Sequence, residues 1–142
     1  MGIALRVNLE RRDFMSTLES DLQSIDRPFE RFELPEAKEV ISYLEGRFEV
    51  ICPVLEEPDN LWLEVELVPN SSGDFIEYVS FHKWLTSIRD EPLGIEGSCN
   101  LIYNHIKKIC SPTKLKVTVQ TGYKTINQKV VKKSWKDDLH KH

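Results

Sequence analysis

The apolar residues in the second half of the chain change their spacing twice. Between Leu61 and Val68 they alternate with other residues, which is the period-two pattern of a strand with one buried face. Helical spacing follows in two stretches, and alternation returns at Leu115 and continues to Val131. Strands on either side of a helix pair, without strict strand–helix alternation, predict an α+β fold in which two helices pack on one face of an antiparallel sheet.

Each helical stretch carries an apolar stripe with spacings of three and four residues. In the first, Asp74 is the predicted N-cap and the helix ends near Pro92; its stripe is Phe81, Trp84, Leu85 and Ile88. The second is closed by Ser111 and Pro112, and its stripe is Cys99, Ile102, Tyr103 and Ile106. Pro69 to Gly73 predicts a turn ahead of the first helix.

The first half of the chain is less regular. Residues 3–9 alternate like a short strand, and Asp13 is a suitable cap for a helix that contains Leu18 and Leu22. A second short helix is predicted after Pro35, ending at Gly46. A sheet of about four strands built this way has open edges, which favour assembly into oligomers.

Length and composition describe a single small domain. The chain has 142 residues, 40% of them hydrophobic and 30% charged, and contains no apolar run of the roughly 18 residues that cross a bilayer. The first residues lack the apolar stretch of a signal peptide. Cys52, Cys99 and Cys110 are an odd number without metal-type spacing, so we expect a reducing cytoplasm, no membrane and no disulfide framework.

Charge is distributed unevenly along the chain. The net charge is −4, but residues 101–142 contain ten lysines against two aspartates, so that this part carries +8 and the first hundred residues carry −12. One interpretation is a basic face for a polyanion such as nucleic acid, with Lys132, Lys133 and Lys136 in a frayed tail. The other is an ordinary solvated surface.

Cys52 and Asp59 form a chemically useful pair. Pro53 and Pro58 restrict the backbone between them, so a thiol and a carboxyl group could be held at the same end of the sheet. A partly ionised cysteine is a good nucleophile, and a nearby carboxylic acid can pass protons to the attacked group. A buried cysteine beside an ordinary turn is the structural alternative.

A longer pattern surrounds this pair and covers about half of the chain. It consists of Cys52-Pro53-Val54, Pro58-Asp59, Glu66 to Pro69, Glu77, Ser80, Leu85 to Arg89, Glu96, and Asn100 to Asn104. In these residues the chain resembles the QueF family of the tunnelling fold (T-fold), whose enzymes act on the nitrile of 7-cyano-7-deazaguanine. The resemblance implies a T-fold that assembles into an oligomeric barrel, a pentamer or a decamer, with sites at subunit interfaces.

The resemblance also implies roles for matching residues. Cys52 would attack the nitrile carbon to form a thioimide, Asp59 would transfer protons, and Glu96 would anchor the polar edge of the deazaguanine. Glu77 and Ser80 would shape the pocket. Structural alternatives stay open, because Glu96 could simply complement a helix dipole and Glu77 could be an exposed helix charge.

Departures from the family pattern bear on the cofactor. Val79 and His82 stand where the family's NADPH-dependent reductases carry lysines, and the later Pro-Arg-Gly-Gly segment is replaced by Gln120 to Lys124. Cationic partners for the phosphates of a nicotinamide cofactor are thereby lost. Ile95 also replaces a histidine that commonly precedes the family's glutamate. The pattern is more similar to the archaeosine synthases of the QueF-like group, in which ammonia attacks the thioimide.

The sequence therefore predicts an amidinotransferase that converts 7-cyano-7-deazaguanine in tRNA to archaeosine with ammonium and without a cofactor. One alternative is the NADPH-dependent nitrile reductase acting on the free base, and another is a catalytically silent nucleic-acid-binding module. No metal is expected, because the four histidines form no ligand constellation: His82, His105, His140 and His142. We take residues 1–142 as one domain, with 48–131 as the family core, 1–47 as an N-terminal extension and 132–142 as a basic tail.

Overall fold

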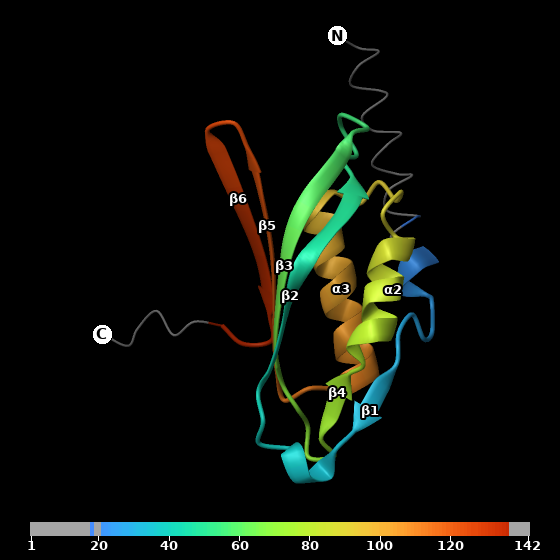
Figure 1. The fold of residues 1–142 in the computed structure, drawn as a ribbon, viewed down its shortest axis with the longest axis vertical. Coiled ribbons are helices and arrows are strands. Elements are labelled where there is room, and N and C mark those ends of the chain that lie inside the picture. The colour runs from blue at the N-terminus through green and yellow to red at the C-terminus, as the bar shows by residue number, and fades with distance from the viewer. Residues whose placement is uncertain (1–17, 19–20, 137–142) are drawn as a thin grey trace, which may run out of the picture.

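The computed structural model describes residue 18 and residues 21–136. Its main sheet has four antiparallel strands in the order β2-β3-β5-β6, with bounds Ser42–Ile51, Pro58–Val68, Lys114–Tyr123 and Ile126–Lys133. Helices α2 (Tyr78–Ser87) and α3 (Gly94–Cys110) both cover the same face of this sheet (Figure 1). The predicted α+β architecture, an antiparallel sheet with two helices on one face, is confirmed.

The core lies between the sheet and the helices. Alternate residues of the central strands are buried against α2 and α3, and these include Leu61, Leu63, Val65 and Leu67 in β3 and Leu115, Val117 and Val119 in β5. The predicted stripe of α3 is buried throughout, at Cys99, Ile102, Tyr103 and Ile106. Period-two burial in the strands and helical burial in α3 therefore agree with the sequence patterns, because each element hides one apolar face.

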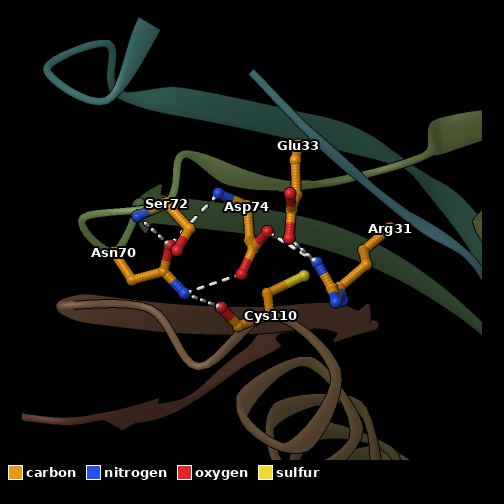
Figure 2. Close-up of polar contacts among 6 residues, drawn as sticks. All are labelled: Arg31, Glu33, Asn70, Ser72, Asp74 and Cys110. Carbon is orange, nitrogen blue, oxygen red and sulfur yellow. Dashed lines mark hydrogen bonds and ion pairs between the residues drawn. The ribbon is translucent and has the colours of Figure 1, made fainter. Parts of the chain in front are cut away.

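The helix predicted to start at Asp74 starts later. Asp74 begins a short strand, β4 (Asp74–Ile76), which pairs with β1 (Arg31–Glu33) in a separate two-stranded sheet. Its buried carboxylate accepts from Arg31 at 2.6 Å and from Asn70 at 2.8 Å (Figure 2). The true N-cap is Glu77, whose carboxylate accepts the backbone N–H groups of residues 79 and 80. Asp74 therefore serves the turn and β4, and the prediction that it caps the helix is wrong.

The same network closes the lower end of the fold. Asn70 donates to the backbone carbonyl of Cys110 at 3.0 Å, and its own carbonyl oxygen accepts the N–H groups of Ser72 and Asp74 (Figure 2). The predicted turn at residues 69–73 is confirmed, and Gly73 in it has φ = 69°. A single asparagine thus connects the turn after β3, the start of β4 and the end of α3.

The helix predicted to end at Gly46 does not form. In this predicted helix only a 3-10 turn, η1 (Pro35–Ala37), forms, and β2 runs through Gly46, which pairs with Leu63. Pairing with β3 along the whole length of β2 stabilises the strand more than the weak helical spacing of a few apolar residues could stabilise a helix. The N-terminal predictions at residues 3–9 and after Asp13 lie outside the described residues, apart from residue 18 and residues 21–23, which are helical.

The predicted hairpin at residues 115–131 is confirmed as β5 and β6, but β6 is longer than expected. It ends at Lys133, so Lys132 and Lys133 belong to the sheet and not to a frayed tail. Lys132 donates to Asn100 at 2.5 Å and to Asn104 at 2.9 Å on α3. Likewise β2 begins at Ser42, so the sheet crosses the predicted boundary between residues 47 and 48. Within the described part of the chain, no helix is long and apolar enough to cross a membrane.

Candidate active site

Cys52 is the first residue after β2, at the start of the connection to β3. The connection is closed by two backbone hydrogen bonds: Cys52 N–H donates to the carbonyl of Glu57 at 2.8 Å, and Glu56 N–H donates to the carbonyl of Cys52 at 2.9 Å. Glu56 adopts φ = 58° in this tight loop. The half-buried Sγ of Cys52 accepts the backbone N–H of Leu55 at 3.5 Å. The loop thus holds the sulfur in one orientation while leaving it accessible to a small molecule.

The N-terminus of α3 packs against this loop. Ile51 N–H donates to the carbonyl of Glu91 at 3.0 Å, which joins the end of β2 to the segment that leads into α3. Gly94 has φ = 66°, and a Cβ placed on it would lie 3.0 Å from Cδ of Pro53 and 3.9 Å from Oε2 of Glu96. Glycine is required here for both reasons. Glu96 is therefore close to the residue that follows Cys52.

Asp59 lies in β3, opposite Val50 of β2, and shares the parity of the buried residues that face the helices. Burial raises the pKa of the Asp59 carboxyl, and the nearby charges of Glu96 and Glu57 raise it further. An aspartic acid that holds its proton to higher pH can act as a proton donor. The two carboxyl groups predicted from sequence, Asp59 and Glu96, are thus electrostatically coupled neighbours.

Glu96 is in the first turn of α3, where a negative charge complements the helix dipole. Its Oε1 accepts the side-chain amide of Gln128, from β6, at 2.8 Å. The structure therefore brings Asp59 and Glu96 together next to the Cys52 loop, at the end of the sheet where β2 connects to β3 (Figure 1). The arrangement combines a thiol, a carboxyl group with a raised pKa and a second carboxylate that accepts hydrogen bonds.

Glu77 and Ser80 lie at the other end of the protomer. Figure 1 shows the start of α2 beside β4, whereas the β2–β3 connection is at the opposite end. Ser80 Oγ accepts the backbone N–H of Glu30 at 2.9 Å and donates to the carbonyl of Glu77 at 3.0 Å. The N–H groups of Val79 and Ser80 lower the pKa of Glu77. Both residues stabilise the helix start in this chain, and a contribution to the Cys52 site would require a second copy of the protein.

The other two cysteines are in a different environment. Burial raises the pKa of the Cys99 thiol to about 11 and that of Cys110 to about 12. Cys99 donates weakly to strand carbonyls, and Cys110 is fully enclosed at the end of α3. Their predicted structural role agrees with this burial, because a buried thiol is a poor nucleophile. Cys52 is the reactive candidate among the three.

A wide groove of about 990 Å³ lies between the two hairpins of the sheet, and Arg47, Asn60, Trp62, Thr121, Gln128 and Lys129 are among the residues that line it. Gln128 connects this groove to Glu96. Gln128 and Thr121 were not predicted as site residues, because alternation indicates which face of a strand a side chain is on but not which side chain it contacts. No group of three or more metal-ligating side chains occurs in the part of the chain that the structure describes.

Comparison with known proteins gives consistent results. No protein-family profile matches the chain. It is 28% identical over 81 residues to an NADPH-dependent 7-cyano-7-deazaguanine reductase from Thermoanaerobacter pseudethanolicus, a match that covers 57% of this chain and 59% of the relative. A second reductase of that name, from Caldicellulosiruptor bescii, is 28% identical over 86 residues, which are 61% of this chain and 64% of the relative. The chain thus spans about three fifths of the length of these curated relatives.

A solved structure, the archaeosine synthase QueF-Like in the apo form, is similar with a TM-score of 0.58 and 29% identity. The match covers 66% of this chain and 92% of that protein. The fold predicted from the resemblance, a T-fold with an antiparallel sheet and two helices on one face, is therefore confirmed at the level of the protomer. Sequence and structure together support a QueF-like family for this chain.

Proposed function

We propose that the protein is a cytoplasmic amidinotransferase that converts the nitrile of 7-cyano-7-deazaguanine in tRNA to the formamidine of archaeosine, with ammonium as the nitrogen donor. The observation that carries this proposal is the convergence of Cys52, Asp59 and Glu96 at one end of the sheet. Each has the chemistry that a nitrile addition needs. The similarity to an archaeosine synthase of the QueF-Like type supports the same choice.

The reaction balances with these residues alone. Sγ of Cys52 adds to the nitrile carbon, one C–N π bond breaks, and the nitrogen takes a proton to give a thioimide. Asp59, with its raised pKa, is the proton donor for this nitrogen. Ammonia, from deprotonated ammonium, then adds to the same carbon and breaks the C=N π bond. A proton moves from the added nitrogen to the sulfur, the C–S bond breaks as the C=N bond re-forms, and the departing Cys52 thiol returns its proton to Asp59, which restores the starting thiolate and carboxylic acid. The product is an amidine, and no electrons are transferred.

Reduction is the second candidate, because the curated relatives are named as NADPH-dependent reductases. A reductase must hold the phosphates of NADPH, and cationic side chains are their usual partners. In α2 this chain has Val79 and His82 at the positions where the resemblance leads one to expect lysines. Ammonia as the second nucleophile avoids this requirement, which is why we favour amidine formation.

The two candidates differ in what discharges the same intermediate. Wild-type protein would be incubated with 7-cyano-7-deazaguanine, as free base and within a tRNA, and the intact protein weighed by mass spectrometry. We expect an adduct that is absent from Cys52→Ala and present in Cys99→Ala. Ammonium should release an amidine product. Release of an aminomethyl product by NADPH would establish the reductase instead, and the absence of any adduct would favour a silent nucleic-acid-binding module.

A tRNA substrate also needs a basic surface. The described lysines offer one around Trp135, where Lys114 and Lys133 each lie 5.6 Å from the centre of the indole ring. Lys116 lies between Lys133 of β6 and Glu66 of β3, so a bound phosphate would add a second negative partner for this pair of lysines. Lys132 is not part of this surface, since it is bonded to α3.

The double variant Lys114→Gln/Lys116→Gln tests this surface. We expect weaker tRNA binding and a shallower dependence of the binding constant on salt, by about 0.7–0.9 in the log–log slope for each lost phosphate contact. Lys108→Gln is the matched control, because Lys108 lies on α3 near Asp26. Equal slopes for the double variant and the wild type would assign these lysines to ordinary surface.

We further propose that the protein is a homo-oligomer. Strands β2 and β6 are open edges of the sheet in a single chain, and pairing of such edges would cover them. An oligomer would also let Glu77 and Ser80 of one copy approach Cys52 of another. Light scattering coupled to size exclusion, over a range of concentrations, would show a pentamer or decamer; a monomer would remove Glu77 and Ser80 from the proposed site.

A further inference from the structure

The β5–β6 hairpin is bonded to both sides of the candidate site. Thr121 of β5 donates its hydroxyl to the backbone carbonyl of Asn60 at 3.1 Å, and Asn60 directly follows Asp59. Gln128 of β6 donates its amide to Oε1 of Glu96 at 2.8 Å. One hairpin therefore contacts the strand that carries the proton donor and the helix that carries the second carboxylate.

These two contacts come from a single cross-strand pair. Thr121 and Gln128 are directly opposite each other in the β5–β6 ladder, and their side chains point to the helix side of the sheet, with the same parity as buried Val119 and half-buried Val130. Side chains of an opposed pair lie about 5 Å apart at Cβ. The pair thus sets a fixed separation between β3 at Asp59 and the first turn of α3.

Only one oxygen of Glu96 is used by Gln128. Oε2 lies on the side of Gly94, 3.9 Å from the position that a Cβ on Gly94 would take, where α3 packs closely against Pro53 of the Cys52 loop. A carboxylate with one oxygen held by an amide N–H is fixed in rotation and presents its second oxygen in a defined direction. Without that bond, the Glu96 carboxylate could rotate, and its coupling to Asp59 would change.

We propose that Gln128 is a positioning residue for the nitrile substrate: by holding Oε1 of Glu96, it fixes the direction of Oε2 near the Cys52 loop, so that Oε2 can accept the N–H groups on the polar edge of the deazaguanine. This inference rests on the proposed function, because it assumes that Glu96 receives the base. It adds a residue outside the pattern from Cys52 to Asn104. The role is substrate orientation, and Gln128 itself takes no part in covalent chemistry.

The test separates binding from chemistry. Binding of 7-deazaguanine, which lacks the nitrile, would be measured by calorimetry with the Cys52→Ala protein, and thioimide formation would be followed with Cys52 present at several nitrile concentrations. Gln128→Met removes the donor at similar side-chain length. We expect the dissociation constant of 7-deazaguanine and the nitrile concentration at half-saturation both to rise about tenfold, which is the size expected for a lost hydrogen bond to a charged group. The limiting rate of thioimide formation should change little.

Two further variants distinguish positioning from a structural role. Gln128→Lys restores a donor and should recover most of the affinity. In a Glu96→Gln background, Gln128→Met should change affinity by less than about twofold, because the contact it removes no longer orients a carboxylate. Val131→Thr, at an exposed position on the opposite face of β6 and outside the groove, is the control and should leave the affinity unchanged.

The outcomes are distinguishable from failure of the proposed function. Adduct formation with discharge by NADPH would change the reaction type but leave the Gln128 inference standing if Gln128→Met weakens binding. Unchanged affinity of Gln128→Met, or equal losses in the wild-type and Glu96→Gln backgrounds, would overturn the inference while leaving Cys52 chemistry intact. No binding of 7-deazaguanine and no adduct in the wild type would overturn both.

Discussion

Lys132 provides the sharpest test of the fold. Its ammonium group donates to the side-chain oxygens of Asn100 and Asn104 on α3 and lies 4.7 Å from the ring centre of Tyr103. Together with the bond from Gln128 to Glu96, it holds β6, an edge strand, to the helix layer. Lys132→Met keeps the apolar stem and removes all of the interactions of the ammonium group with one change.

The expected loss can be estimated from these contacts. A hydrogen bond to a charged group contributes about 1.5–3 kcal/mol when buried, and a partly exposed cation–π contact contributes about 0.5–1 kcal/mol. Lys132 is only half-buried, so the two hydrogen bonds are worth less than their buried values. We therefore expect Lys132→Met to reduce the free energy of unfolding by about 2 kcal/mol, or the melting temperature by roughly 5–8 °C.

The assay is urea unfolding followed by circular dichroism at one fixed protein concentration. Lys129→Met is the matched control, because it removes the same charge from the same strand on the helix-free face, and we expect a change within about 0.5 kcal/mol. A double-mutant cycle with Asn104→Ala should give a coupling of about 1 kcal/mol. Equal effects of Lys132→Met and Lys129→Met would refute the reasoning and return Lys132 to the solvated surface.

Three other predictions concern single positions. Gly73→Ala should destabilise the protein by more than about 2 kcal/mol, because Gly73 has φ = 69° and a Cβ there would lie 2.3 Å from the carbonyl oxygen of Leu34; Gly46→Ala, whose Cβ would meet nothing within 4 Å, is the thermal-melt control and should be nearly neutral. Burial, aided by Lys108, lowers the pKa of His105 from 6.5, so the unfolded chain binds the proton first and stability should fall as pH drops below about 6.5; urea titrations between pH 7.5 and 5.5 should show a smaller fall for His105→Gln, and an identical fall would contradict this assignment. Because the pKa of Asp59 is raised in the folded protein, ionisation of this group lowers the free energy of unfolding as pH increases. The stability of Asp59→Asn relative to wild type should therefore rise between pH 3.5 and pH 7, and a constant difference between the two proteins would show that folding does not raise the pKa of Asp59.

Charge and capping residues were the least predictable parts of the fold. Asp74 is a good helix cap by residue type, yet its carboxylate is taken by Arg31 from a strand more than forty residues earlier. Glu77, for which a pocket role and an exposed helix charge were both expected, caps α2 within one chain. The hydrogen bonds of each side chain depend on partners that are distant in sequence or that compete nearby. The sequence pattern does not indicate which of these partners forms the bond.

The candidate site was also only partly predictable from the sequence. The pattern of residues indicated Cys52, Asp59 and Glu96, and the structure brings the two carboxyl groups together beside the cysteine loop because Gly94 lets α3 approach Pro53. Gln128 could not be inferred, since its contact to Glu96 spans 32 residues and depends on the register of β6 against β5.

Period and spacing by themselves determined β3, the β5–β6 hairpin, the two helices and the core residues that these elements carry, because burial of one face per element is a local property of the sequence. They did not determine β2, which only its pairing with β3 makes a strand. Tertiary structure decided which polar groups meet. It moved the start of α2 to Glu77, extended β6 to include Lys132, and placed Gln128 against Glu96. The physical reason is that apolar burial is non-directional and follows from the pattern, whereas a hydrogen bond requires two particular atoms within about 3 Å, and only the folded chain sets that distance.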